Sequence, residues 1–382
     1  MRYTIGQLAE IIDGDRGKNY PKQDEFYPQG YCLFLNTGNV TKEGLIFEEN
    51  QFITKEKDEA LRKGKLKRGD IVYTTRGTVG NAGYYNSSVP YENVRINSGM
   101  VILRSNGEIV DARFLYQILK SEYYRPYFKQ YCTGSAQPQL PIKNFSQIYL
   151  NVPDIKTQHR IADILSVYDN LIENNQKQIK LLEEAAQRLY KEWFVDLRFP
   201  GHENTKIVDG VPEGWSRGLL KELISVNYGK DHKKAPDDGN IPVYGSGGLM
   251  RKCNKSLFSG EAVLIPRKGS LNNIMYVDET FWTVDTMFYA TMKQPHTAVF
   301  VYFFVKAFDM YSMNIGAAVP SMTAKILDAM DVVIPDKEAL EKFDKCAKTY
   351  FNKIKTLQGQ NERLKIARDL LLPKLMSGEV EV

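Results

Sequence analysis

The sequence lacks the features that would place this chain in a membrane or in a disulfide-stapled class. Its cysteines, Cys32, Cys132, Cys253 and Cys346, lie far apart and form no CxxC pair. This argues against a zinc site or a disulfide framework and favours a reducing cytoplasm. The most apolar run, AVFVYFF at 298–304, is far too short to span a bilayer, and the N-terminus has no signal-peptide pattern. We therefore expect a cytoplasmic protein with no membrane partner.

Catalytic motifs are also missing. No GxxxxGK[ST] phosphate loop occurs, which excludes ATP hydrolysis of that type, and neither an Asn-Pro-Pro-aromatic loop nor a glycine-rich cofactor turn is present. The histidines His159, His202, His232 and His296 are scattered, with no paired metal spacing. We expect no catalytic residue, no metal and no cofactor. The formal net charge is only +5, so any basic surface must be local.

The chain contains an internal repeat. The stretch GSAQPQL at 134–140 returns as GAAVPSM at 316–322, and both copies precede a hydrophobic run that ends in Pro-Asp. From the hinge to the Pro-Asp pair, matching residues of the two copies lie 182 positions apart. With 382 residues and 43% hydrophobic content, the chain can form two or more cores. The repeat therefore predicts two related halves.

A long helix is predicted after each copy. Residues 155–194 contain neither Gly nor Pro and are rich in helix-forming residues. With Ile161 at heptad position a, apolar residues fill the a, d and e columns, and the same frame continues after the second copy because 182 is a multiple of seven. Asp154 and Asp336 are the expected N-caps.

Two matching helices in one chain are expected to pack together as an antiparallel intramolecular coiled coil, because a small domain alone cannot bury so long an apolar stripe. Asn175 falls at an a position of this stripe. Either it is buried and fixes the register of the two helices, or it marks a water-exposed kink. The pattern leaves both readings open.

The remaining segments, roughly 1–150 and 213–334, carry short β-rich runs separated by Gly, Asn and Pro. GDIVYTTRGTVG at 69–80 parallels GEAVLIPRKGSL at 260–271, and FLYQILKS at 114–121 parallels FVYFFVKA at 300–307. The loops DGDRGKNYPKQDEFYPQG and NYGKDHKKAPDDGNIPVYGSGG show no likeness. We predict one fold with diverged loops.

Such a chain presents two different contact surfaces at a fixed separation, which suits two unlike half-sites on a linear polymer. A helix of ~40 residues is ~60 Å long at about 1.5 Å per residue. At about 3.4 Å per base-pair step, this length spans at most ~18 base pairs of duplex DNA.

The sequence resembles the specificity subunit of type I restriction-modification systems. The likeness covers essentially the whole chain and rests on TQHRIADIL and LIENNQKQIKLLEEAAQRLYKEWFVDLRF, on NERLKIARDLLLPKLMSGEV and on GSAQPQL. IPVYGSGG, IPRKGS and FWTVDTMF also look like one common type of recognition domain.

This resemblance implies an α+β protein in which two mixed α/β target-recognition domains are separated by two long helices, packed as an antiparallel intramolecular coiled coil with a pseudo-twofold repeat. The implied divisions are a first recognition domain at 1–150, a central helical spacer at 151–199, a linker at 200–212, a second recognition domain at 213–334 and a C-terminal helical spacer at 335–382.

The resemblance also implies partners. Each domain would read one half of a bipartite, asymmetric site in double-stranded DNA, and the helices would set the spacing and dock two methyltransferase subunits. Restriction (translocase) subunits would join through the methylation complex. The chain itself would be non-catalytic.

Two polar loops offer candidate DNA contacts. Basic side chains in them can neutralise phosphates, while Gly, Ser and Asn allow close backbone approach. The candidates are Lys18, Asn19 and Lys22 in the first segment and Lys230, Lys233, Lys234 and Ser246 in the second. A basic loop taken singly is more often only solvated.

Two predicted hairpin tips hold further candidates. They are Arg76 and Thr78 in TTRGT, and Arg267, Lys268 and Ser270 in PRKGS. Arginine there can read guanine O6 and N7 in the major groove. Pairing with a nearby carboxylate is an equally open alternative.

Two other features have competing interpretations. Gln137, and Gln139 beside it, carry amides suited to adenine, but their place before a helix suggests backbone capping. Tyr116, Leu119, Tyr123 and Tyr127 recur at helical spacing, which favours the inner face of a short helix over base stacking.

Rival functions remain. Pro153-Asp154 could be mistaken for part of a nuclease carboxylate cluster, but its repeat at 335–336 favours capping. A fused restriction enzyme would need catalytic domains for which 382 residues leave no room. A scaffold with two protein-binding β domains on a rod would ignore DNA, whereas a DNA reader would show salt-sensitive binding.

Overall fold

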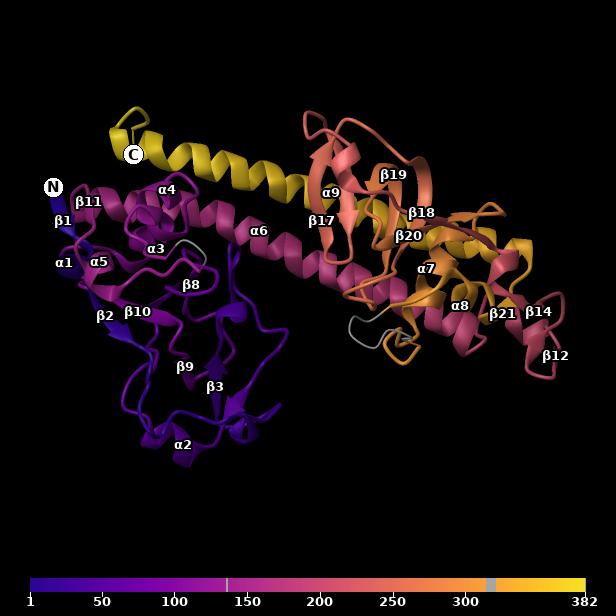
Figure 1. Ribbon diagram of the computed structural model, residues 1–382, viewed down its shortest axis with the longest axis horizontal. Coiled ribbons are helices and arrows are strands. Elements are labelled where there is room, and N and C mark those ends of the chain that lie inside the picture. Colours follow the sequence, from indigo (N-terminus) through magenta and orange to yellow (C-terminus); the bar gives the residue numbers. More distant parts are fainter. Residues whose placement is uncertain (135–136, 314–320, 382) are drawn as a thin grey trace. The chain divides into compact units, whose positions relative to one another are not determined.

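The computed structural model describes residues 1–134, 137–313 and 321–381 (Figure 1). Most of the second hinge copy, GAAVPSM, lies outside the described residues. The chain divides into two compact units: unit 1 comprises Met1–Asn175 and Gly359–Val382, and unit 2 comprises Gln176–Gln358. Each unit therefore takes part of each long helix.

The two long helices form as predicted. Helix α6 runs over Ile155–Tyr190 and passes into a π-helical turn at Lys191–Val195, and α9 runs over Lys337–Ser377. The Asp154 carboxylate accepts from Thr157 N at 3.0 Å, and the Asp336 carboxylate accepts from Ala339 N at 2.8 Å. Both predicted N-caps are confirmed, and capping explains the two Pro-Asp pairs.

The helices pack antiparallel within each unit. In unit 1, Ile161 and Leu165 near the start of α6 share a core with Leu375 near the end of α9. In unit 2, Trp193 just beyond α6 contacts Phe343 near the start of α9, with ring centroids 5.9 Å apart. The predicted intramolecular coiled coil is confirmed.

The seam between the helices uses the a and e columns of the predicted frame. These columns alternate in steps of three and four residues, which keeps one stripe facing the partner. The buried seam residues are Ile161, Leu165, Ile172, Asn175 and Ala186 on α6, and Leu340, Phe343, Ala347, Ile354, Leu357, Asn361 and Leu375 on α9. Two residues of the d column lie outside the seam: Leu171 is 45% exposed and Cys346 is exposed.

Unit 1 is built on a four-stranded antiparallel sheet. Its order is β2 (Ala9–Asp13), β10 (Met100–Ser105), β7 (Ile71–Thr74) and β8 (Ala82–Tyr84). A second sheet has the order β6 (Phe52–Ile53), β3 (Cys32–Leu35) and β9 (Val94–Ile96), with β3 and β9 parallel. Smaller pairs join β1 (Arg2–Thr4) to β11 (Tyr149–Asn151) and β4 (Val40–Thr41) to β5 (Gly44–Leu45).

Short helices complete unit 1. They are α1 (Ile5–Leu8), α2 (Lys55–Ala60), α3 (Ala112–Lys120), α4 (Arg125–Lys129) and α5 (Ile142–Ser146), with 3-10 turns at Gln23–Glu25 and Thr37–Asn39. The N-cap of α3 is Asp111, whose carboxylate accepts from Phe114 N at 2.9 Å. The face of α3 that carries Phe114, Leu115 and Ile118 is buried in one core with Ile161 of α6.

Unit 2 contains one larger sheet. Its order is β15 (Ile224–Tyr228), β20 (Met287–Met292), β18 (Phe258–Pro266), β19 (Met275–Thr283), β16 (Ile241–Gly245) and β17 (Gly248–Cys253), with β16 and β19 parallel. The smaller pairs are β14 (Ser216–Leu219) with β21 (Asp331–Ile334) and β12 (Ile207–Val208) with β13 (Val211–Pro212). The helices are α7 (Ala298–Lys306) and α8 (Ala324–Asp328), with 3-10 turns at His202–Asn204, Leu220–Glu222 and His232–Lys234.

The two units follow one plan. The sheet order β2-β10-β7-β8 of unit 1 returns as β15-β20-β18-β19 in unit 2. The pair β1·β11 returns as β14·β21, and α3 and α5 return as α7 and α8. The predicted α+β class with two mixed α/β domains is confirmed.

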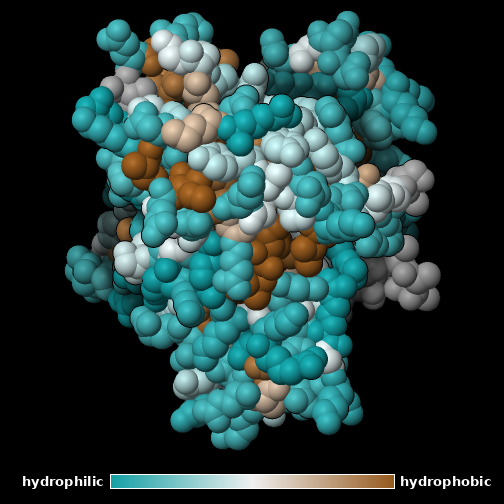
Figure 2. Space-filling view, turned by 90° about the vertical axis from the view of Figure 1, so that its left-hand side faces the viewer, coloured by the Kyte–Doolittle hydropathy of each residue, from teal (hydrophilic) through white to brown (hydrophobic). Residues whose placement is uncertain are grey.

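On the face drawn in Figure 2, most residues are hydrophilic, and hydrophobic residues gather only in small groups. Among the described residues, no helix combines the length and apolar character needed to cross a bilayer.

Candidate nucleic-acid interface

In each unit, one sharp turn gathers the loops that carry the predicted DNA contacts. In unit 1 this is the turn 97–99 between β9 and β10, and in unit 2 it is the turn 284–286 between β19 and β20. We call these the central turns. Their carbonyl groups accept hydrogen bonds from the hairpin tip, and the basic loop starts against their other side.

The hairpin tip is held by a matching hydrogen-bond pattern in the two units. In unit 1, the N–H groups of Thr75 and Arg76 both donate to Gly99 O, at 2.9 and 3.1 Å. In unit 2, the N–H groups of Arg267 and Lys268 both donate to Thr286 O, at 2.8 and 3.2 Å.

This pattern corrects the predicted alignment of the hairpins by one residue. The sequence match pairs Arg76 with Arg267, but the shared bonds pair Thr75 with Arg267 and Arg76 with Lys268. The strands agree, because Thr74 faces Met100 as Pro266 faces Met287. The sequence alignment matched the two arginines because they are the same residue type. Strand pairing, not residue type, decides which residue stands at the tip.

The repeated hinge supports this tip. Leu140 N donates to Thr75 O at 2.9 Å, and Met322 N donates to Arg267 O at 2.9 Å. Leu140 and Met322 are equivalent positions of the GSAQPQL and GAAVPSM stretches. The chain carries the hinge twice because each copy ties its hairpin tip to the segment that enters the long helix.

The backbone of a glycine is in close contact with each central turn. A Cβ atom on Gly14 would stand 2.3 Å from Asn97 O, and one on Gly229 would stand 2.0 Å from Val284 O. Both contacts are too short for any side chain, so only glycine fits. Gly14 directly follows β2 and Gly229 directly follows β15.

These glycines open the two basic loops, which makes the loops equivalent in position. The sequences of the two loops show no likeness, as predicted, yet both loops begin at the same place in the fold. They differ only in length and side chains.

In unit 1, a buried carboxylate shapes the start of the basic loop. Asp15 is 4% exposed and accepts from Gly17 N at 2.6 Å and Arg62 N at 2.7 Å. Burial raises the pKa of Asp15, but these N–H donors and the Arg62 charge outweigh burial and hold it below its ordinary value. Arg16 in the same loop donates to Ser98 O at 3.2 Å.

The candidate residues of this loop divide into two kinds. Asn19 Nδ2 donates to Ala60 O at 3.0 Å, so its side chain fastens the loop to α2. Lys18 and Lys22 are exposed and available to a polyanion.

In unit 2, the basic loop is fastened to the sheet. Lys230 N donates to Thr283 O at 3.0 Å, and Trp282 Nε1 donates to Lys230 O at 3.1 Å. Arg251 on β17 donates to Ala235 O at 2.6 Å and so holds the end of the loop. The lysines Lys230, Lys233 and Lys234 are exposed.

The side chains of the hairpin tips are largely free for a partner. Arg76, Thr78, Lys268 and Ser270 are exposed. Arg267 lies over the Tyr228 ring at 5.5 Å and donates to Asp285 O at 3.2 Å. Within the described residues, neither Arg76 nor Arg267 forms an ion pair, so the structure does not show the carboxylate pairing left open by the sequence.

Ser246 joins the unit 2 group through its backbone. It lies at the tip of the β16–β17 hairpin, where Ser246 O accepts from Asn273 Nδ2 at 2.9 Å. In unit 2, the hairpin tip with Arg267 and Lys268 and the start of the basic loop at Gly229 both lie at the central turn. In unit 1, the tip with Arg76 and the start of the basic loop at Gly14 do so.

Gln137 is exposed, and the capping alternative finds no support. The N-cap of α5 is Pro141, which makes no side-chain hydrogen bond. Gln139 instead pairs its backbone with Thr133, at 2.7 and 2.9 Å. Ser135 and Ala136 between them lie outside the described residues.

The tyrosine prediction is partly wrong. Leu119 is buried as expected, but Tyr123 is 61% exposed. The reason is that α3 ends at Lys120 and a separate helix, α4, begins at Arg125. Helical spacing across this break therefore has no structural meaning.

Sequence reasoning missed several residues of the interface. They are Tyr228, Arg251, Ser98 and Asp285. Each comes from a strand or turn whose position depends on sheet pairing. The one available signal was a glycine directly after a β-rich run, followed by lysine or arginine.

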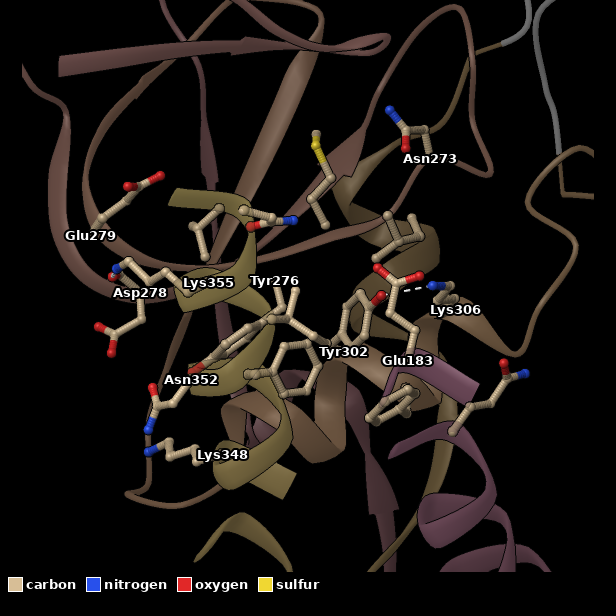
Figure 3. Close-up of a pocket in the computed structure, with 18 of the residues that line it drawn as sticks. Glu183, Asn273, Tyr276, Asp278, Glu279, Tyr302, Lys306, Lys348, Asn352 and Lys355 are labelled. Carbon is tan, nitrogen blue, oxygen red and sulfur yellow. Dashed lines mark hydrogen bonds between the residues drawn. The ribbon is translucent and has the colours of Figure 1, made fainter. Parts of the chain in front are cut away.

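Unit 2 also holds a cavity of about 750 Å³ between β19, α6, α7 and α9. Figure 3 shows Glu183, Tyr302 and Lys306 on one side of it and Asp278, Glu279 and Lys355 on another. Burial raises the pKa of Glu183 above its ordinary value. The lining carries charges of both signs and therefore does not define one class of ligand.

The corresponding place in unit 1 is filled by an ion-pair cluster. Asp169 on α6 accepts from Lys120 at 2.7 Å, Gln117 at 2.6 Å and Arg368 at 2.8 Å. Burial raises the pKa of Asp169, but Lys120 and Arg368 outweigh burial and bring it below its ordinary value. At the repeat position of Asp169, α9 carries Phe351.

No catalytic constellation emerges from the described residues. They contain no group of three or more His, Cys, Asp or Glu side chains that could hold a metal ion. All four cysteines are free thiols.

Two related α/β units, each offering a glycine-backed basic loop and a cationic hairpin tip, and sharing a pair of antiparallel helices, define a nucleic-acid-reading class of protein. The sequence profile described as "Type I restriction modification DNA specificity domain" matches residues 1–184 and 212–365. The chain belongs to this family.

The chain is also similar to individual type I specificity subunits. The HindI specificity subunit of Haemophilus influenzae is 24% identical, over 98% of this chain and 100% of the relative. The MjaIX specificity subunit of Methanocaldococcus jannaschii is 24% identical, over 85% of this chain and 81% of the relative. The crystal structure of a type I S subunit from M. genitalium shares the fold, with a TM-score of 0.57 and 18% identity over 98% of this chain and 95% of that one.

Proposed function

We propose that this chain is the DNA sequence-specificity subunit of a type I restriction-modification complex. Residues 1–150 and 213–334 are the two recognition domains, and each reads one half of a bipartite, asymmetric site in double-stranded DNA. The helical regions 151–199 and 335–382 set the spacing, with 200–212 as the linker.

The observation that carries this proposal is the repeated central turn. In both units a hairpin tip donates backbone hydrogen bonds to this turn and a glycine-led basic loop lies against it, while the side chains at equivalent positions differ. Shared scaffolding with unlike side chains suits two half-sites of unlike sequence. Phosphate contacts by the lysines and by the cations of the hairpin tips supply affinity, and the hairpin tips also contact base edges.

The proposed DNA-contacting set follows from this surface. In unit 1 it comprises Lys18, Asn19, Lys22, Arg76, Thr78 and Gln137. In unit 2 it comprises Lys230, Lys233, Lys234, Ser246, Arg267, Lys268 and Ser270. Asn19 contributes mainly by shaping its loop, because its amide is engaged with Ala60 O.

Catalysis then belongs to partners. We propose that two methyltransferase subunits dock on the helical regions and that restriction subunits join through them, in the cytoplasm. The specificity subunit contributes no metal, cofactor or reacting group.

The test is DNA binding followed by methylome sequencing. The chain alone should bind duplex DNA with an affinity that falls steeply with salt. With the methyltransferase subunits of the same system, it should direct methylation to one bipartite motif. A chain that ignores DNA at low salt would instead fit a protein scaffold and would overturn the proposal.

A further inference from the structure

The central turn of unit 2 carries an acidic residue among its cations. Asp285 occupies the middle of the turn and is exposed. The guanidinium of Arg267 donates to Asp285 O at 3.2 Å, and the backbone of Lys268 is fastened to the next residue, Thr286. A carboxylate therefore stands on the surface that the lysines would present to phosphates.

This carboxylate does not serve to balance its neighbours. Across the ranges that the structure describes, Asp285 forms no ion pair and its side chain accepts no hydrogen bond. Arg267 uses its guanidinium on the main-chain oxygen and on the Tyr228 ring instead. The turn itself is held by backbone bonds to Thr286 and Val284, so it does not need the Asp285 side chain.

A free carboxylate weakens phosphate binding, because like charges repel. Its one favourable contact with duplex DNA is a base that offers a hydrogen-bond donor, since an ionised carboxylate only accepts. In the major groove, cytosine presents its N4 amino group and adenine its N6 amino group, whereas guanine and thymine present acceptors.

We propose that Asp285 is a specificity-determining residue that accepts a hydrogen bond from the amino group of a base, cytosine N4 foremost, in the half-site read by unit 2. This rests on the proposed function and deepens it. Arg267 holds the turn and Tyr228 holds Arg267, so the carboxylate is presented by a fixed backbone.

The equivalent position in unit 1 is Ser98, whose carbonyl is bound by Arg16 as that of Asp285 is bound by Arg267. A hydroxyl both donates and accepts, so it selects less strongly than a carboxylate. The central residue thus has the same position in both turns but carries a different side chain in each unit.

The experiment compares methylomes of a host that carries the methyltransferase subunits with the wild-type chain, Asp285→Ala, Asp285→Asn or Ser98→Ala. Exchange of residues 213–334 with another family member first shows which half-site unit 2 reads. Asp285→Ala should make one cytosine or adenine position of that half-site degenerate, with about 10- to 100-fold lost discrimination. Asp285→Asn should shift that position toward adenine.

The other half-site and the spacer should stay unchanged in both Asp285 variants, and Ser98→Ala should leave the unit 2 half-site intact. An unchanged motif with Asp285→Ala would overturn the inference. So would a uniform rise in DNA affinity with no change of motif, because that would show that Asp285 only screens its cations. Absence of any bipartite motif with the wild-type chain would instead overturn the proposed function itself.

Discussion

Asn175 Nδ2 donates a 2.8 Å hydrogen bond to Asn361 Oδ1 across the two long helices. The residues are 8% and 5% exposed and interrupt an otherwise apolar seam. Asn175 is therefore buried and not an exposed kink, as the register-fixing interpretation requires. A pair of amides satisfies itself only when the helices meet in this alignment, so a slip of the seam would leave both unpaired.

Loss of one amide should therefore cost more than loss of both. Asn175→Leu leaves Asn361 buried without its partner and should lower the free energy of unfolding by about 1–3 kcal/mol. The double variant Asn175→Leu with Asn361→Leu should recover most of that loss. Urea denaturation of the full chain measures both. Equal destabilisation by the single and double variants would contradict a register role.

The Asp169 cluster should give stability that depends on pH. Asp169→Asn removes the acid between Lys120 and Arg368 and should cost about 3 kcal/mol, because it leaves cations with little access to water. The Arg113–Asp163 pair offers a control, since Asp163 is 64% exposed and its removal should cost about 0–1 kcal/mol.

The sign of the pH effect follows from the lowered pKa of Asp169. Its contribution is complete above the ordinary aspartate pKa and is lost as pH falls through the lower folded value. Denaturation curves measured from pH 6 downwards give the free energy of unfolding at each pH. In Asp169→Asn, this free energy should fall less steeply with pH than in the wild type. If Asp169→Asn kept the wild-type pH dependence of the free energy of unfolding, another group would be responsible for that dependence.

The glycines behind the central turns should tolerate no side chain. Gly229→Ala would place a Cβ 2.0 Å from Val284 O and should displace the basic loop or unfold unit 2. Gly247→Ala is the matched control, because its Cβ would meet nothing within 4 Å. Circular dichroism and DNA affinity should separate the two variants. Equal DNA binding by both would contradict the role of the turn.

The corrected hairpin alignment makes a prediction about charge. Arg76 and Lys268 occupy equivalent positions in their units. Arg76→Ala and Lys268→Ala should therefore each reduce the slope of log affinity against log salt by about 1. Arg267→Ala should change this slope by a different amount, because the Arg267 side chain is engaged with Tyr228 and the Asp285 carbonyl. Salt titrations of the three variants test this. If Arg267, and not Lys268, matched Arg76, the alignment from the sequence letters would be right after all.

The spacer prediction concerns both helices together. Insertion of seven residues after Gln176 and seven before Gln360 keeps the alternation of three and four along the seam. Each helix would lengthen by about 10 Å at about 1.5 Å per residue, which is about three base-pair steps. Methylome sequencing should show a spacer lengthened by that amount. An unchanged spacer would disprove the proposal that the helices set it.

The sequence was sufficient for the features that depend on local pattern. The 182-residue repeat, the two long helices and their N-caps at Asp154 and Asp336 all follow from residue spacing and helix propensity. The burial of Asn175 was left open by the pattern and was decided by the partner helix. Helical periodicity reports which face is apolar whatever the neighbours are. It could not choose between the d and e columns, because only the partner helix decides which flank is covered.

The candidate interface was predictable in composition but not in geometry. Basic loops and hairpin arginines are visible as letters, yet the equivalence of Gly14 with Gly229 and of Arg76 with Lys268 depends on strand pairing between segments far apart in the chain. A shift of one residue in a strand turns every side chain to the other face, and sequence likeness does not resolve it.

The sequence by itself therefore determined that this protein is a duplicated chain on paired helices, because periodicity is a local property. Only the tertiary structure decided which residues meet at the central turns and that a free carboxylate, Asp285, stands among cations there. Those meetings come from backbone hydrogen bonds between distant strands, which no local pattern specifies.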